Sequence, residues 1–134
     1  MNFVNEVPHI FITGIPASGK STLAYQLSQT TGLPWVELDT YFPKLNTGEY
    51  DKLTPQAIIL ALHRSSIVEG VQLMELKAST LKGLVCIVDA SNDVILHRYV
   101  ASGAWSNLSA DDQKIKIIDV VSRFRKRLQE FQIS

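Results

Sequence analysis

Residues 14–22 combine, in one uninterrupted run, the residue types that can bind a chain of phosphates. Gly14 and Gly19 let successive backbone N–H groups point at one anion, because no Cβ blocks the approach. Lys20 is a flexible cation that can reach the terminal phosphates, and the Ser21 hydroxyl can supply an oxygen ligand to Mg²⁺. The spacing is that of the Walker A motif, G-x-x-x-x-G-K-[ST].

The flanking residues have the character that this motif requires. Residues 10–13 form a short apolar run typical of a buried strand, and residues 21–31 carry apolar side chains at helical spacing. A glycine turn with an exposed lysine would not need such flanks. We therefore predict a phosphate-binding loop that holds MgATP and consists of Gly14, Ile15, Pro16, Ala17, Ser18, Gly19, Lys20, Ser21 and Thr22.

Acidic residues accompany three further predicted strands, which span residues 33–39, 66–73 and 84–89. Asp39 and Asp89 end their strands, whereas Glu69 and Gly70 interrupt theirs where a turn is expected. The carboxyl ends of parallel strands meet at one edge of a sheet, and ligands bind there. We therefore expect the three acids to lie near Gly14.

These acids suggest different chemical roles. Asp39 is the candidate that orients and deprotonates an acceptor hydroxyl, although it could instead cap the turn that follows. Glu69 and Asp89 compete for the place nearest Mg²⁺. We favour Glu69, because an acid within a strand is costly unless a cation or hydrogen bonds compensate it. Asp89 is then predicted to cap or support the phosphate loop.

The remaining pattern alternates strands with helices. Thr54-Pro55 is a typical helix start, and we expect a well-buried helix over residues 56–64. Ser91 or Asn92 should cap the next helix, and Ser109 should cap one of about twenty residues whose apolar seam we interpret as core contact. The order predicts a single domain over residues 1–134, a three-layer α/β fold with a mainly parallel sheet of about four strands.

Composition narrows the possible partners. The 134 residues contain thirteen basic and thirteen acidic side chains, so no overall field favours nucleic acid, and the basic residues near the end of the last helix are interpreted mainly as a solvated face. No apolar run approaches the length of a membrane span, and we expect a cytoplasmic protein. The three histidines lack metal-ligand spacing. The oligomeric state stays open.

Residues 9 to about 100 resemble the small P-loop kinases, the group that contains uridine kinases, shikimate kinases and adenylate-kinase-like enzymes. Residues 14–22 match the phosphate loop of the group, and Leu38-Asp39-Thr-Tyr41 is similar to its acidic turn after the second strand. Ile67-Val-Glu69-Gly70 resembles a segment whose carboxylate lies near the metal in uridine-kinase-like members. The resemblance implies the P-loop NTPase fold and an ATP-dependent kinase.

Residues 89–98 are similar to the segment that leads, by way of an arginine, into the lid of these kinases. We predict that Arg98 and residues to about 109 form a mobile lid whose guanidinium reaches the transferred phosphoryl group; Arg98 could instead pair with Asp93. The chain departs from the group in two ways. Nothing after residue 90 has the pattern of the usual fifth strand, and the next arginine after Arg98 is Arg123.

These observations predict a phosphotransferase that moves the γ-phosphate of ATP to a hydroxyl, or a phosphate, of a small metabolite or nucleoside, with Lys20, Asp39 and Arg98 as catalytic residues. The alternative is a nucleotide-binding regulatory module, or an NTPase without kinase activity, which the missing strand favours. Residues 40–53 are expected to form a loop on the acceptor side.

Overall fold

Four parallel strands form the sheet, and the strand that leads into the phosphate loop lies inside it. The computed structural model describes residues 3–42 and 54–134. The strands pair in the order β2-β3-β1-β4. Their bounds are β1 His9–Gly14, β2 Trp35–Glu37, β3 Ile67–Glu69 and β4 Gly83–Val88. The predicted parallel sheet of about four strands is confirmed.

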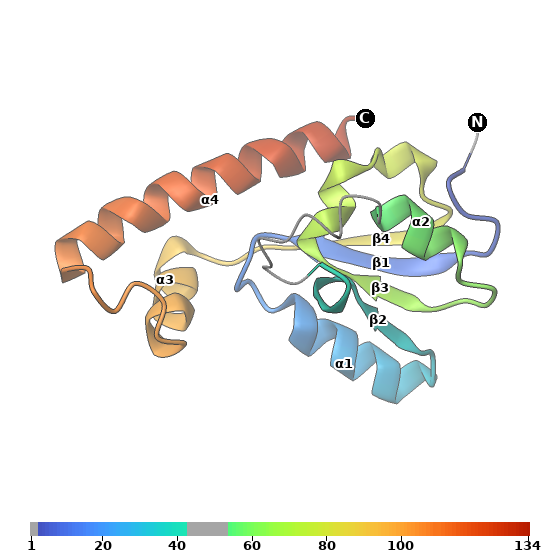
Figure 1. The fold of residues 1–134 in the computed structure, drawn as a ribbon, viewed down its shortest axis with the longest axis horizontal. Helices are drawn as coiled ribbons and strands as arrows, with labels where there is room; N and C mark the ends of the chain where they lie inside the picture. The colour runs from blue at the N-terminus through green and yellow to red at the C-terminus, as the bar shows by residue number, and fades with distance from the viewer. Residues whose placement is uncertain (1–2, 43–53) are drawn as a thin grey trace.

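Helices cover both faces of this sheet (Figure 1). Helix α1 (Lys20–Thr31) lies on one face, where Ile12 packs in a small core with Ala24. The other face carries α2 (Pro55–Leu60) and part of α4 (Ala110–Gln132), and there Phe11 joins the larger core. Neighbouring residues of β1 are therefore fully buried on opposite faces, as a central strand of a three-layer fold requires.

Helix α2 begins as predicted but is shorter and less buried. Thr54 accepts a hydrogen bond from the Ala57 amide at 3.1 Å, which confirms the predicted start. The expected helix over residues 56–64 is wrong in length, because α2 ends at Leu60 and the Ala61 amide already bonds in the tighter pattern that closes a last turn. Leu60 is 53% exposed, so the helix buries one face only.

The outer strands are also shorter than the sequence pattern indicated. Instead of running over residues 33–39, β2 stops at Glu37, and a 3-10 helix, η1 (Leu38–Thr40), follows it. Instead of running over 66–73, β3 stops at Glu69 and leads through Gly70 into the 3-10 helix η3 (Val71–Glu75). A third 3-10 helix, η4 (Ala78–Thr80), precedes β4. The early ends place Asp39 and Glu69 at the edge of the sheet.

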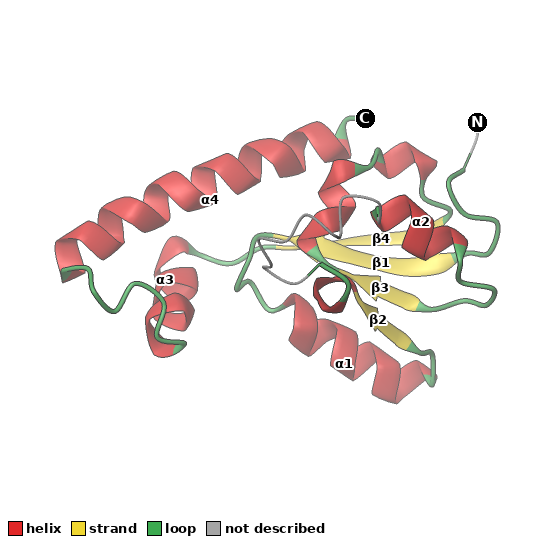
Figure 2. Ribbon diagram, in the orientation of Figure 1, coloured by secondary structure: helices red, strands yellow, loops and turns green. Residues whose placement is uncertain are grey.

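The last two helices extend beyond the carboxyl ends of the strands (Figure 2). Ser91 caps helix α3 (Asn92–Ala101), and its hydroxyl accepts a hydrogen bond from the Val94 amide at 3.3 Å. Ser109 caps α4 in the same way and accepts from the Asp112 amide at 3.1 Å. Both predicted caps are confirmed, as is the buried seam of α4, which includes Ile117, Val121, Leu128 and Phe131.

Within the described residues no strand follows β4, as the sequence pattern indicated. Most of the predicted acceptor loop, residues 43–53, lies outside the described part of the chain. In that described part, no helix combines the length and the apolar character needed to cross a membrane.

Candidate active site

The phosphate loop connects β1 to α1 and passes very close to β4. Gly14 has φ +144°, and a Cβ on it would lie 1.9 Å from the carbonyl oxygen of Val88. The Ile15 amide donates to that same oxygen at 3.2 Å. Only glycine tolerates both the dihedral angle and the contact. The first glycine of the motif therefore fixes the loop against the sheet.

Lys20 is buried at the first turn of α1. It is 8% exposed, and its Nζ donates to the carbonyl oxygen of Ile15 at 2.8 Å, across the loop. Burial lowers the pKa of Lys20, and the negative charges of Glu69 and Asp39 oppose that shift. The ammonium group is therefore held in the loop close to both carboxylates.

Glu69 ends β3 beside the first turn of α1. It is 2% exposed, and its Oε1 accepts a hydrogen bond from the Ser21 hydroxyl at 3.2 Å. Burial raises the pKa of Glu69, whereas the bond from Ser21 and the charge of Lys20 lower it. Ser21 and Glu69, the two residues that the sequence singles out for Mg²⁺, thus lie together and offer two oxygen atoms that suit a hard cation.

Asp39 lies in η1 and lines a cavity that Lys20 and Glu69 also line. Its Oδ1 accepts a hydrogen bond from Gln72 Nε2 of η3 at 2.7 Å, so one carboxylate oxygen has a fixed partner. The sequence did not indicate Gln72, because it stands on a separate turn after β3. The structure brings Asp39, Glu69 and Gly14 to one edge of the sheet, as expected.

The side chain of Arg98, from α3, contacts the phosphate loop. Its Nη1 donates to the carbonyl oxygen of Ala17 at 2.7 Å. The bond joins this side chain to the loop rather than to Asp93, the alternative partner. Ala17 adopts φ +62°, a left-handed conformation that is uncommon for a residue with a Cβ. The Arg98 guanidinium thus bonds to the carbonyl oxygen of a residue in a strained backbone conformation.

Asp89 does not support the phosphate loop, contrary to expectation. Its carboxylate forms an ion pair with Arg125 of α4 at 3.2 Å and accepts from the Ala90 amide at 2.7 Å. Arg125 also donates to Asn92 Oδ1 at 2.9 Å and to the Ala90 carbonyl at 3.0 Å. Because β4 is followed directly by α3, this contact ties α4 to the turn before α3.

A cavity of about 750 Å³ opens at this edge of the sheet. Part of its lining consists of the phosphate loop with Arg98, Asp39 and Glu69. Another part, here called the far wall, comes from α3, the following turn and α4. Its members are Tyr99, Trp105, Lys116, Val120 and Phe124.

Sequence reasoning included Tyr99 and Trp105 only within the predicted lid, which runs from Arg98 to about residue 109. It did not assign the other members of the far wall, Lys116, Val120 and Phe124, to the site. Phe124 belongs to the last helix, whose apolar seam was interpreted as core contact, and no motif links the members of the far wall to one another. Apart from Val120, the members of the far wall share only aromatic or cationic character, which many surface positions also have. Among the described residues, no group of three or more His, Cys, Asp or Glu side chains forms a metal site.

Two solved structures with a similar backbone are named as kinases. A shikimate kinase from Bacteroides thetaiotaomicron has a TM-score of 0.62 and 19% identity, over 93% of this chain and 83% of that one. A gluconokinase from Sinorhizobium meliloti 1021 has a TM-score of 0.54 and 18% identity, over 90% and 77% of the two chains. No protein-family model and no curated protein matches the sequence. At these identities the likeness establishes the fold, that of the small P-loop kinases, as the motifs predicted.

Proposed function

We propose that the protein transfers the γ-phosphate of ATP to a hydroxyl group of a small acceptor. The observation that carries this proposal is the convergence of Lys20, the Ser21–Glu69 pair, Asp39 and Arg98 on one cavity at the carboxyl edge of the sheet. Phosphoryl transfer needs a phosphate cradle, a metal ligand, an acid beside the acceptor and cations for the transferred group. The structural neighbours are named as kinases, which supports the reaction class.

Each residue has a defined task in the proposed reaction. The acceptor oxygen forms a bond to the γ-phosphorus while the bond to the β–γ bridging oxygen breaks, and ADP leaves. Asp39 takes the hydroxyl proton, and Gln72 holds its other oxygen in place. Lys20 and Arg98 stabilise the negative charge on the transferred group and the leaving phosphate.

Mg²⁺ fits the site through Ser21 and Glu69. The hydroxyl and the carboxylate lie 3.2 Å apart, and Mg²⁺ commonly uses only one or two protein oxygens while substrate phosphates and water complete its shell. When bound, the metal supplies charge neutralisation to the phosphates. Ser21 would bind it, and Glu69 would orient Ser21 or a water of the metal.

Acceptor dependence of ATP consumption tests the proposal. ADP formation is measured with MgATP alone and with a panel of hydroxylated small molecules, with Lys20→Ala as the inactive control. We expect ADP formation to rise with an acceptor and phosphorylated acceptor to accumulate in equal amount. Consumption that no acceptor stimulates would identify an NTPase, and nucleotide binding without consumption would identify a binding module; either result would contradict the proposal.

A further inference from the structure

Lys116 lies on the far wall, over the ring of Trp105. Its Nζ lies 5.0 Å from the ring centroid of Trp105, within the range of a cation–π contact. Trp105 also stacks on Tyr99, with ring centroids 4.7 Å apart and an angle of 13° between the planes. The indole therefore contacts both the phenol and the ammonium group.

The turn that carries Trp105 is itself anchored to α4. Gln113 Nε2 donates to the Trp105 carbonyl at 3.1 Å and to the Leu108 carbonyl at 3.4 Å. Trp105 has φ +61°, a left-handed conformation that is unfavourable for a residue with a Cβ. A bulky residue keeps such a conformation only where its surroundings impose it. The arrangement around Lys116 is thus a built feature of the cavity.

The charges of the cavity are unevenly distributed. Lys20 lies close to Asp39 and Glu69, and Arg98 bonds to the phosphate loop. For Lys116, the structure of residues 3–42 and 54–134 gives no ion pair and no hydrogen bond. A third cation therefore lines the cavity outside the phosphate loop.

The position of Lys116 relates it to the acceptor rather than to ATP. Helix α4 packs against η3, and Gln72 of η3 holds Asp39, the proposed base. Val71 of η3 and Val120 and Phe124 of α4 line the same cavity as Asp39 and Lys116, and these three apolar side chains are here called the apolar strip. A molecule that places its hydroxyl at Asp39 and its body on this strip would reach Lys116 with its other end.

We infer that the acceptor carries an anionic group, a carboxylate or a phosphate, which Lys116 binds. The inference rests on the proposed function, since it assigns the substrate class of the same cavity. A charge-assisted hydrogen bond from Lys116 would orient the acceptor with its hydroxyl toward Asp39. The apolar strip favours a compact carbon framework between the hydroxyl and the anion. The substrate class is thus a hydroxy acid or a phosphorylated hydroxy compound.

Matched pairs of probes test this inference. For the carboxylate arm, glycerate, gluconate and quinate are compared with their methyl esters; for the phosphate arm, ribose 5-phosphate and uridine 5′-phosphate are compared with ribose and uridine. Binding to protein saturated with MgADP is measured by calorimetry, and phosphate transfer from MgATP is measured separately. We expect one arm to contain an anionic probe that binds about tenfold to a hundredfold more tightly than its neutral partner.

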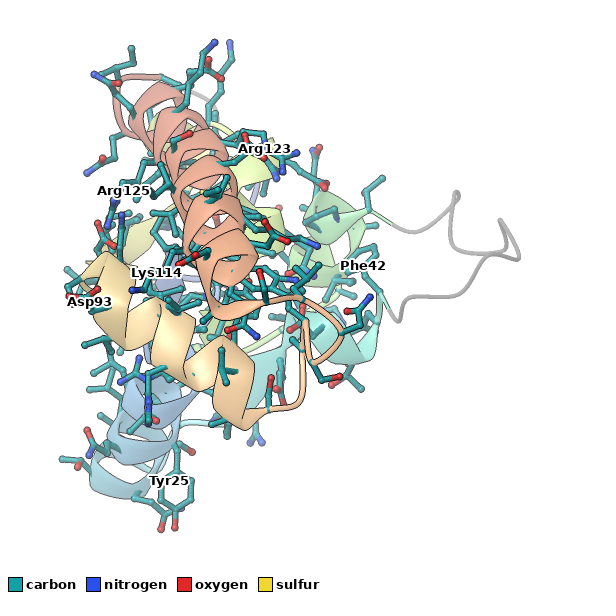
Figure 3. All side chains as sticks on the ribbon, turned by 90° about the vertical axis from the view of Figure 1, so that its left-hand side faces the viewer. Tyr25, Phe42, Asp93, Lys114, Arg123 and Arg125 are labelled. Atoms are coloured by element: carbon teal, nitrogen blue, oxygen red, sulfur yellow. The ribbon has the colours of Figure 1, made fainter. Side chains whose placement is uncertain are left out.

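Lys116→Gln should remove that preference, whereas Lys116→Arg should largely keep it. The matched control is Lys114→Gln, which makes the same change on the same helix. Lys114 lies on the flank of α4 that carries Arg125, whereas Arg123, two turns after Lys116, lies on the other flank (Figure 3). We expect Lys114→Gln to behave as the unmodified protein and MgATP affinity to be unchanged in all variants.

The outcomes separate this inference from the proposed function. Anionic binding that depends on Lys116 but leads to no transfer would support the anion site and contradict the kinase proposal. Transfer to neutral probes that Lys116→Gln does not affect would support the kinase and overturn the inference. Equal affinity within every pair, or binding of no probe, would also overturn it.

Discussion

The two sides of the cavity are built in contrasting ways. The phosphate loop is one continuous segment whose contacts come largely from its own backbone: Gly14 abuts β4, and Ile15 both donates to Val88 and accepts from Lys20. The far wall comes from separate segments and acts through side chains, such as the stack of Trp105 on Tyr99. A backbone site places phosphates in one way only, whereas a side-chain wall can be altered one residue at a time. Substitutions in each part should therefore differ in kind as well as in size.

Lys20→Ala should have the largest effect. It removes the one cation of the phosphate loop, so we expect catalytic efficiency with MgATP to fall about a thousandfold. The far wall should stay intact, because Lys20 contacts the loop carbonyl of Ile15. Kinetics and calorimetry with MgATP measure the loss, and circular dichroism confirms the fold. Unchanged MgATP binding in a folded variant would disprove the assignment of the loop.

Asp39→Asn should separate the chemical step from nucleotide binding. The amide keeps the size of the side chain and an oxygen that can accept from Gln72, but it cannot take a proton. We expect turnover to fall about a hundredfold while MgATP affinity stays within about twofold. A variant with near-normal transfer would show that Asp39 only caps its turn.

Arg98→Lys tests the contact between the two sides, since Arg98 belongs to α3 but bonds to Ala17. Lysine keeps the charge and loses the planar fork, so we expect turnover to fall about tenfold, equivalent to about 1.4 kcal/mol of transition-state stabilisation. Arg123→Lys is the control, because Arg123 forms an exposed ion pair with Asp119.

The same experiment can address the proposed lid. If residues 99–109 close over the substrates, MgATP with an acceptor should slow protease cleavage there in the unmodified protein and less so in Arg98→Lys. Cleavage at one rate with and without ligands would argue against a closing segment.

Glu69→Gln should affect metal binding and stability in opposite directions. The concentration of Mg²⁺ needed for half-maximal activity should rise roughly tenfold. In the ligand-free protein, burial holds the pKa of Glu69 above its ordinary value of 4.5, so the folded state binds a proton more readily than the unfolded state and stability falls as pH rises through that interval. The variant removes this cost.

We therefore expect thermal unfolding of ligand-free Glu69→Gln at pH 7 to occur roughly 2–6 °C higher than in the unmodified protein. The difference should shrink as the pH is lowered toward 4, where Glu69 itself becomes protonated. A lower melting temperature at pH 7 would mean that the charge of Glu69 stabilises the fold.

Ala17→Gly should have the smallest effect. Glycine relieves about 1 kcal/mol of left-handed strain but gives the unfolded chain more freedom, and the two terms nearly cancel. The control is Ala57→Gly in α2, where no strain is relieved and a loss of roughly 0.5–1 kcal/mol is expected. Urea denaturation measures both, and equal losses would show that Ala17 is not strained.

The sequence predicted those parts that depend on neighbouring residues. The phosphate loop, Thr54, Ser91 and Ser109 follow from signals within a few positions, and the parallel sheet follows from the alternation of elements. Glu69 was expected near Mg²⁺, for which Ser21 is the other predicted ligand, because an acid within a strand needs a compensating partner, and the two side chains lie together.

The contact of Arg98 with Ala17 and the contribution of α4 to the far wall could not be predicted in this way. Arg125 of α4 bonds to Asp89 and Asn92 at the start of α3. Arg98, which reaches the phosphate loop, lies on that same helix. The left-handed turn at Trp105 and the link from Gln72 to Asp39 likewise depend on segments that approach one another only in the folded chain. Side-chain packing between distant segments has no local signature.

Helix α4 has consequences for how such a protein could diversify. Ile117, Val121, Leu128 and Phe131 are buried in the core, whereas Lys116 and Val120 face the cavity from adjacent positions of the same helix. A substitution at a cavity-facing position can therefore alter which molecule is held without a loss of core packing, and without a change in the phosphate loop. Selection, or a designed library confined to this flank, could therefore change which molecule the cavity binds while the rest of the site stays the same.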